Sequence, residues 1–112
     1  KTILCYGDSN TYGLKSDLVS RYPRNVRWTG ILQEKLVQST MLLKKVLVEE
    51  PQCGMICRGL QKWEKYLLPC LDSHKPLDLV IIMLGTNDLK SRFSVTPFDI
   101  GASMENLVKN DL

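Results

Sequence analysis

Two short polar segments contain residue types that can do chemistry together. Gly7-Asp8-Ser9-Asn10 offers a serine hydroxyl, and Gly85-Thr86-Asn87-Asp88 offers a side-chain amide. A hydroxyl nucleophile and a neutral hydrogen-bond donor are two components of an acyl-transfer site. Taken alone, segments of this composition are more often ordinary turns rich in Gly, Asp, Ser and Asn. What they do therefore depends on the elements that position them.

Each polar segment follows an apolar run of the kind found in buried strands. Thr2–Tyr6 precedes the first segment and Asp78–Leu84 precedes the second, while Val46–Val48 is a further strand candidate. Because these runs do not alternate between apolar and polar residues, they are typical of strands covered on both faces, as in parallel sheets.

Between these strand candidates, the apolar residues are spaced as in helices. Apolar residues at 28, 31, 32 and 36 predict one helix, and residues 60–71 predict another. Thr96 is the expected N-cap of a third helix, with Pro97 at its first position and Asp99 at its third. Residues 13–27 are expected to form a loop. Strands alternating with helices predict an α/β domain with a parallel sheet, whose ligands bind beyond the carboxyl ends of the strands.

Length and composition limit the remaining classes of function. The 112 residues predict one domain, residues 1–112, and the charge sum of 15 basic minus 12 acidic residues is +3. That charge is too weak and too dispersed to predict nucleic-acid binding. The apolar runs are shorter than a membrane span, and no signal peptide is visible, so a cytoplasmic domain without membrane attachment is expected.

The order of residues in these segments adds a family resemblance. Ile3–Gly13 resembles the first sequence block of the SGNH (GDSL) hydrolases, and Val80–Asp88 resembles their third block. Val26–Gly30 and Leu68–Asp78 look like the arylesterase and acyltransferase branch of that family. The resemblance covers most of the chain, from Lys1 to about Val108.

This resemblance implies a fold, an activity and a set of site residues. The fold would be a three-layer α/β sandwich with a flavodoxin-like parallel sheet, lacking the C-terminal strands of the family. The activity would be acyl transfer from a small ester to water or an alcohol, without a metal or organic cofactor. Ser9 would be the nucleophile, and its backbone N–H, a second-block N–H and the Asn87 side chain would form the oxyanion hole. Asp8 and Asp88 would stabilise their turns, and Arg27 and Trp28 would be structural.

The chain departs from the family between Glu50 and Tyr66. Gly54 falls where the second oxyanion N–H should be, but Met55 takes the place of the family's arginine, and Ile56 and Cys57 take the place of its threonines. Read one base later, a possible coding sequence for residues 59–64 gives Gly-Phe-Lys-Asn-Gly, which is nearer the family pattern. We therefore hypothesise that residues 51–65 are a frameshifted stretch, which resequencing of the DNA would test.

The family's Asp-x-x-His block, which supplies the catalytic base, has no match in residues 1–112. The single histidine, His74, stands at a position that is not catalytic in the family, so little or no activity is expected of this chain. Without later strands, the outer edge of the Asp78–Leu84 strand would be unpaired and apolar, which predicts self-association.

Two other functions remain open at this point. Cys53, Cys57, Cys70 and His74 have a spacing close to that of a structural zinc site. A site with an intact rim and no base could also bind a small acyl compound or a protein partner without catalysis. Cys5, in an apolar run, is expected to be a core residue.

Overall fold

The computed structural model describes residues 1–46, 56–89, 94 and 96–111 of the chain. Contacts between residues divide the chain into two compact units. The first unit comprises Lys1–Glu49 and His74–Met83, and the second comprises Glu50–Ser73 and Leu84–Leu112. No helix among the described residues is long and apolar enough to cross a membrane.

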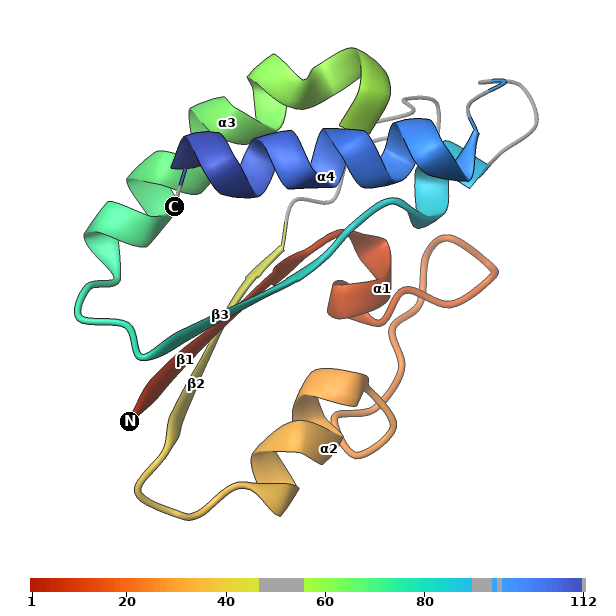
Figure 1. The fold of residues 1–112 in the computed structure, drawn as a ribbon. Helices are drawn as coiled ribbons and strands as arrows, with labels where there is room; N and C mark the ends of the chain where they lie inside the picture. Colours follow the sequence, from red (N-terminus) through yellow and green to blue (C-terminus); the bar gives the residue numbers. More distant parts are fainter. Residues whose placement is uncertain (47–55, 90–93, 95, 112) are drawn as a thin grey trace. The chain divides into compact units, whose positions relative to one another are not determined.

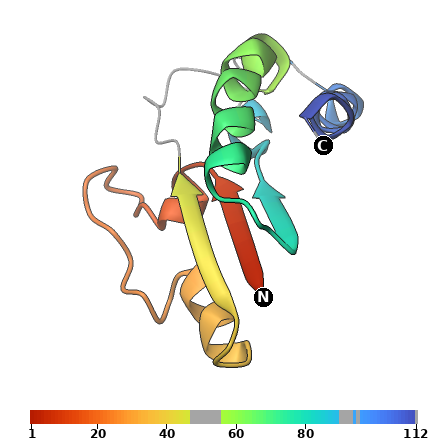
Figure 2. The same cartoon turned by 90° about the vertical axis from the view of Figure 1, so that its left-hand side faces the viewer.

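The first unit is built on a three-stranded parallel sheet. Its strands are β1 (Thr2–Gly7), β2 (Met41–Val46) and β3 (Leu79–Met83), in the order β2-β1-β3, and Figure 2 shows β1 between the other two. This order is the beginning of the flavodoxin-like arrangement. In the register, Gly7 at the end of β1 pairs with Val46 on one side and Met83 on the other.

The central strand has the sequence of a strand buried on both faces. Ile3, Leu4, Cys5 and Tyr6 are all buried in succession, which is why the run does not alternate. The predicted strand at residues 2–6 is confirmed, and it continues to Gly7. The predicted α/β class with a parallel sheet is confirmed as well.

The second strand differs from the prediction. β2 begins at Met41 and ends at Val46, whereas the apolar pattern placed a strand at residues 46–48. The prediction started too late because Lys44 and Lys45 interrupt the apolar run, and residues 47 and 48 lie outside the described part. On an edge strand, lysine side chains reach solvent without disturbing the ladder of backbone hydrogen bonds.

Two helices and a loop complete the first unit. The short helix α1 (Ser9–Tyr12) follows β1 directly, and α2 (Trp28–Lys35) confirms the helix predicted from Trp28. Both helices contact β2. Gly30 lies in the first turn of α2, where a Cβ atom would stand 1.8 Å from the carbonyl oxygen of Arg24, so only glycine fits against the preceding loop.

The second unit contains two long helices that pack on each other, α3 (Ile56–Ser73) and α4 (Pro97–Asp111) (Figure 1). Leu67, Cys70 and Leu71 on α3 and Leu107 on α4 are buried. The predicted start of α4 is confirmed. Thr96 Oγ1 accepts from Asp99 N at 3.2 Å, and Thr96 N donates back to Asp99 Oδ2 at 3.1 Å. This reciprocal pair satisfies backbone donors that the first turn of a helix leaves free.

Candidate active site

The candidate nucleophile, Ser9, stands at the carboxyl end of the central strand. β1 ends at Gly7, Asp8 is the N-cap of α1, and Ser9 is the first residue of that helix. The Asp8 carboxylate is buried and accepts a hydrogen bond from Asn10 N at 2.9 Å, while the carbonyl of Asp8 accepts from Tyr12 N at 3.0 Å. Asp8 therefore holds the turn, as predicted, and Ser9 is left half-buried beside it.

Glycines at both ends make this turn possible. A Cβ atom on Gly7 would stand 2.1 Å from Thr11 Oγ1 and 2.7 Å from the carbonyl oxygen of Met83. Gly13 ends α1 with a φ of +83°, and its N–H donates to the carbonyl of Ser9 at 2.9 Å. Because L-residues rarely adopt a positive φ, glycine here closes the helix after one turn. The Ser9 backbone is thus fixed by contacts local to residues 7–13 and by β3.

The loop that follows is more ordered than its polar composition predicts. Leu14 and Arg21 form an antiparallel bridge, and Tyr22 N donates to the carbonyl of Gly13 at 2.8 Å. At the tip, the Asp17 carboxylate accepts from Val19 N at 2.9 Å and from Ser20 N at 2.8 Å. These bonds, with that from the Ser20 hydroxyl, lower the pKa of Asp17 to about 2.

The second polar segment forms a different kind of turn. β3 ends at Met83, Gly85 has a φ of +104°, and Thr86–Leu89 form the 3-10 helix η1, which contains Asn87. The structure therefore describes the backbone of Asn87 but not its side chain. Here again a glycine supplies a conformation that other residues adopt at a cost.

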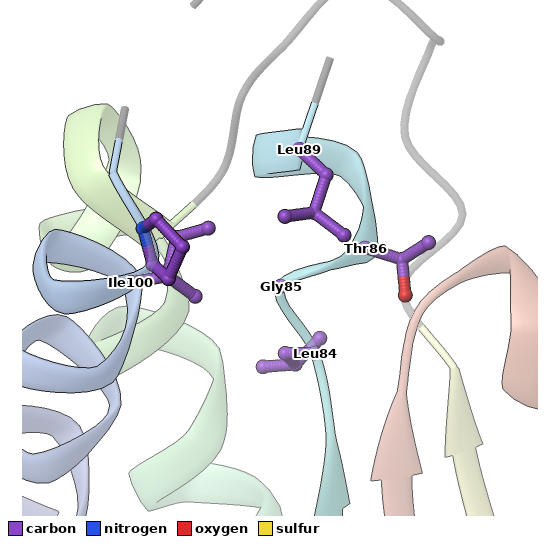
Figure 3. Close-up of a pocket in the computed structure, with 6 residues that line it drawn as sticks. Leu84, Gly85, Thr86, Leu89 and Ile100 are labelled. Carbon is purple, nitrogen blue, oxygen red and sulfur yellow. The ribbon is translucent and has the colours of Figure 1, made fainter. Parts of the chain in front are cut away.

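A pocket of about 290 Å³ opens beside this turn within the second unit (Figure 3). Its lining is mainly apolar and comes from the two residues that follow β3, from η1 and from the start of α4. The lining residues are Leu84, Gly85, Thr86, Leu89, Pro97 and Ile100. This pocket was not predicted from the sequence, although the apolar residues at the start of the helix at Pro97 were a usable signal.

The three predicted oxyanion groups fall in different parts of the molecule. Ser9 belongs to the first unit and Asn87 to the second, while Gly54 lies outside the described residues. What the structure does bring together is the carboxyl ends of β1 and β3, because Gly7 pairs with Met83. The oxyanion hole itself stays a prediction.

The chain's one histidine lies at the opposite end of the sheet from Ser9. His74 comes shortly before Asp78, whose N–H donates to the carbonyl of Thr2 at 2.9 Å, at the amino end of β1. Ser9 follows the carboxyl end of the same strand. Six residues of strand span about 17–20 Å, far beyond hydrogen-bond reach. The alternative in which His74 serves as the base for Ser9 is therefore disfavoured by the fold.

The zinc alternative falls largely outside the described atoms. Cys53 is not among the described residues, and the side chain of Cys57 in α3 is not described either. Cys70 is buried in α3. Among the atoms that the structure does describe, no group of three or more potential ligands gathers around a common point. Cys5 is a core residue, as predicted, and its burial raises the pKa of its thiol.

Comparison with known proteins gave one family model and several solved structures that are similar to this chain. The model of the GDSL-like lipase/acylhydrolase family matches residues 5–110. The structure of an inhibitor-bound aryl esterase from M. smegmatis is similar over 97% of this chain and 53% of its own, with 39% identity and a TM-score of 0.77.

A second similar structure is a carbohydrate acetylesterase family member from Sinorhizobium meliloti. It has 31% identity and a TM-score of 0.78, over 97% of this chain and 52% of its own. The chain thus spans about half the length of these structures. Comparison with curated proteins gave no match.

Proposed function

Because the chain belongs to the GDSL-like lipase/acylhydrolase family, we propose that the protein is a serine esterase or acyltransferase that acts on small esters. The observation that carries the proposal is the position of Ser9. It occupies the Gly-Asp-Ser turn at the carboxyl end of the central strand, on a backbone fixed by the Asp8 cap and by Gly7 and Gly13. Ligands of parallel sheets bind at this end.

The proposed reaction proceeds through an acyl-enzyme. Ser9 Oγ attacks the ester carbonyl carbon and gives its proton to a base, which forms a tetrahedral intermediate. The intermediate then collapses, its bond to the alkoxy oxygen breaks, and the alcohol leaves with the proton from the base. Water or a second alcohol then attacks the acyl group and frees Ser9. The N–H groups of Ser9 and Gly54 and the Asn87 amide would donate hydrogen bonds to the negative oxygen of both tetrahedral intermediates.

The proposed reaction needs a base for Ser9, which the family pattern places outside residues 1–112. The family resemblance assigns it to an Asp-x-x-His block, which residues 1–112 do not contain, and His74 lies at the other end of the sheet. We therefore expect the 112-residue chain by itself to turn over esters slowly. An oxyanion hole and substrate binding alone can still leave a residual rate above that of water.

The apolar pocket beside η1 supports an acyl chain as its ligand. It begins at Leu84 and Gly85, two to three residues before Asn87 along the chain, and its volume of about 290 Å³ suits a small group. The aryl esterase and the acetylesterase family member among the similar structures support short acyl esters as the substrate class. Replacing Ile100 by phenylalanine should then reduce kcat/KM more for butyl than for acetyl esters.

The test joins this chain to the C-terminal half of the M. smegmatis aryl esterase, the half that the similarity does not cover. We expect the 112-residue chain to hydrolyse a short-chain aryl ester slowly and the chimera to hydrolyse it rapidly. Ser9→Ala should abolish the activity of the chimera, and Ser16→Ala, an exposed serine of the following loop, should leave it unchanged.

Labelling by a fluorophosphonate gives an independent readout, because only an activated serine reacts quickly. We expect labelling of the chimera at Ser9 and slow labelling of the 112-residue chain. A chimera that is folded, inactive and unlabelled would contradict the proposal and favour non-catalytic binding. Full activity of the Ser9→Ala chimera would contradict the assigned nucleophile.

A further inference from the structure

Thr11 is a fully buried polar residue close in sequence to the candidate nucleophile. It is the third residue of α1, which begins at Ser9, and its side chain is not exposed to solvent. Its hydroxyl oxygen has no hydrogen-bond partner among the residues that the structure describes. Burial of such a hydroxyl is unfavourable, because it has left water without gaining a partner in the protein. Its place in the fold therefore needs a reason other than hydrogen bonding.

The atoms around Gly7 supply that reason. The point where a Cβ of Gly7 would stand lies 2.1 Å from Thr11 Oγ1 and 2.7 Å from the carbonyl oxygen of Met83. Two oxygen atoms, one from α1 and one from β3, therefore lie against the same side of the Gly7 Cα atom. Gly7 ends β1 and pairs with Met83, the last residue of β3. The Thr11 side chain thus lies where the ends of these two strands meet the first helix.

The kind of atom that faces Gly7 matters because the space is narrow. Oxygen approaches a Cα–H group to about 3.3–3.6 Å, whereas two carbon atoms are at their optimum at about 3.5–4.0 Å. A methyl group in place of Thr11 Oγ1 would therefore move Gly7 by roughly 0.3 Å. Because Ser9 follows Gly7 by two residues on a backbone that the Asp8 cap holds, the nucleophile would move with it.

Thr29 is the natural comparison for Thr11 within the same unit. It is also fully buried, and its hydroxyl likewise has no hydrogen-bond partner in the described part of the chain. Thr29 belongs to the first turn of α2, however, and is not among the atoms that lie nearest to Gly7. The two threonines therefore share their burial and their unpartnered hydroxyl, and they differ in the backbone that they face.

We propose that Thr11 is a positioning residue for the acyl-transfer reaction, whose hydroxyl oxygen, packed against Gly7 beside the Met83 carbonyl, sets the position of Ser9 relative to the end of β3. Thr11 acts through the backbone, because a fully buried side chain has no access to substrate. The proposal rests on the esterase function proposed above. A displacement of about 1 Å can lower turnover about 100-fold, so a shift of roughly 0.3 Å should have a smaller effect.

Steady-state kinetics of the chimera with the aryl esterase test the proposal. Thr11→Val keeps the shape of the side chain and replaces the oxygen by a methyl group, so kcat for a short-chain aryl ester should fall about tenfold while KM hardly changes. Thr11→Ser keeps the oxygen and should retain most of kcat. Thr29→Val is the matched control and should leave kcat unchanged. Thermal unfolding of each variant shows whether the fold is retained.

Crystal structures of the 112-residue chain and of its two valine variants give a readout that does not depend on activity. We expect Gly7 Cα to move away from position 11 by roughly 0.3 Å in Thr11→Val and to stay in place in Thr29→Val. An inactive parent chimera would contradict the esterase function, and these structures would then decide the position of Ser9 by themselves. An unmoved Gly7 in Thr11→Val, or equal losses of kcat for the two valine variants, would overturn the proposal.

Discussion

The turn after β1 and the turn after β3 both contain a glycine at the carboxyl end of a parallel strand, yet they are held in place differently. The first is enclosed by contacts of its own unit, because Asp8 caps α1, Thr11 is fully buried and Gly13 closes the helix. The second turns at Gly85, continues as the 3-10 helix η1 and leaves a pocket open beside it.

This difference assigns different tasks to the two turns. The nucleophile turn belongs to the first unit, and its geometry depends on buried contacts that tolerate little change. The turn with Asn87 belongs to the second unit and contributes a side chain to the proposed oxyanion hole. We therefore expect substitutions of Gly7 and Asp8 in the first turn to affect folding, and substitution of Asn87 in the second turn to affect turnover.

The largest expected effect concerns Asn87. In the chimera with the aryl esterase, Asn87→Ala should lower kcat about 100- to 1000-fold, because one hydrogen bond to the developing oxyanion is lost. The midpoint of thermal unfolding should hardly move. Asn10→Ala is the control, since Asn10 is an exposed residue of the other turn. Equal losses of kcat for both variants would remove the functional distinction between the turns.

The next largest expected effect is on stability, and it differs in sign between alanine substitutions at two glycines. Gly7→Ala places a methyl group 2.1 Å from Thr11 Oγ1 and 2.7 Å from a backbone oxygen, and should lower the free energy of unfolding by about 3 kcal/mol. Gly101→Ala adds a methyl with nothing within 4 Å in the helix α4, and should raise it by about 0.5–1 kcal/mol. Urea denaturation measures both, and a neutral Gly7→Ala variant would contradict the packing described for the nucleophile turn.

Removal of the two helix N-caps should give a smaller difference in stability. Asp8→Ala should destabilise by about 2 kcal/mol, because a buried cap is lost, and Thr96→Ala by about 1 kcal/mol, because the Thr96 cap is exposed. Asp8→Asn and Thr96→Ser keep a capping oxygen and should recover most of each loss. A larger loss of unfolding free energy for Thr96→Ala than for Asp8→Ala would contradict the expected order of the two caps.

The smallest effect is a pH dependence in the loop after the nucleophile turn. Hydrogen bonds from Ser20 and Val19 lower the pKa of Asp17 from 3.8 to about 2 in the folded chain. The stability that they contribute is therefore present above pH 3.8 and is lost as the pH falls through 2. NMR titration of the Asp17 carboxyl and of the Val19 and Ser20 amide protons measures this. An Asp17 that titrates near 3.8 would show that these bonds are absent in solution.

Local signals account for the elements that the sequence predicted well. Thr96 was predictable as a cap because its side chain reaches the backbone N–H three residues ahead. Asp8 was expected to stabilise its turn, whereas the one-turn helix α1 that it caps was not predicted. β1 was predictable because four successive buried residues leave an uninterrupted apolar run. The assignment of Ser9 followed from the Gly-Asp-Ser order and the family resemblance, and its place at a strand end agrees with that assignment.

What the sequence missed depends on distant contacts. β2 starts at Met41 because its register with β1 outweighs the two lysines in its middle. The ordered loop from Leu14 to Arg21 owes its shape to a bridge and to a stacked ring in addition to the local hydrogen bonds of Asp17. The role of Gly54 stays a prediction and the zinc site stays an open alternative. Both depend on residues or side chains that the structure does not describe.

The central position of β1 has a consequence for biosynthesis. β1 is translated before both of its partners: it pairs with β2 through Thr2 and Met41, 39 residues apart, and with β3 through Ile3 and Leu79, 76 residues apart. One edge of this buried strand therefore stays unpaired until β2 has been translated, and the other until β3 has been translated. At about 5–20 residues per second, this interval lasts several seconds, during which the strand is a target for chaperones or for wrong pairing. Slower translation between β2 and β3 should therefore lower the yield of folded protein.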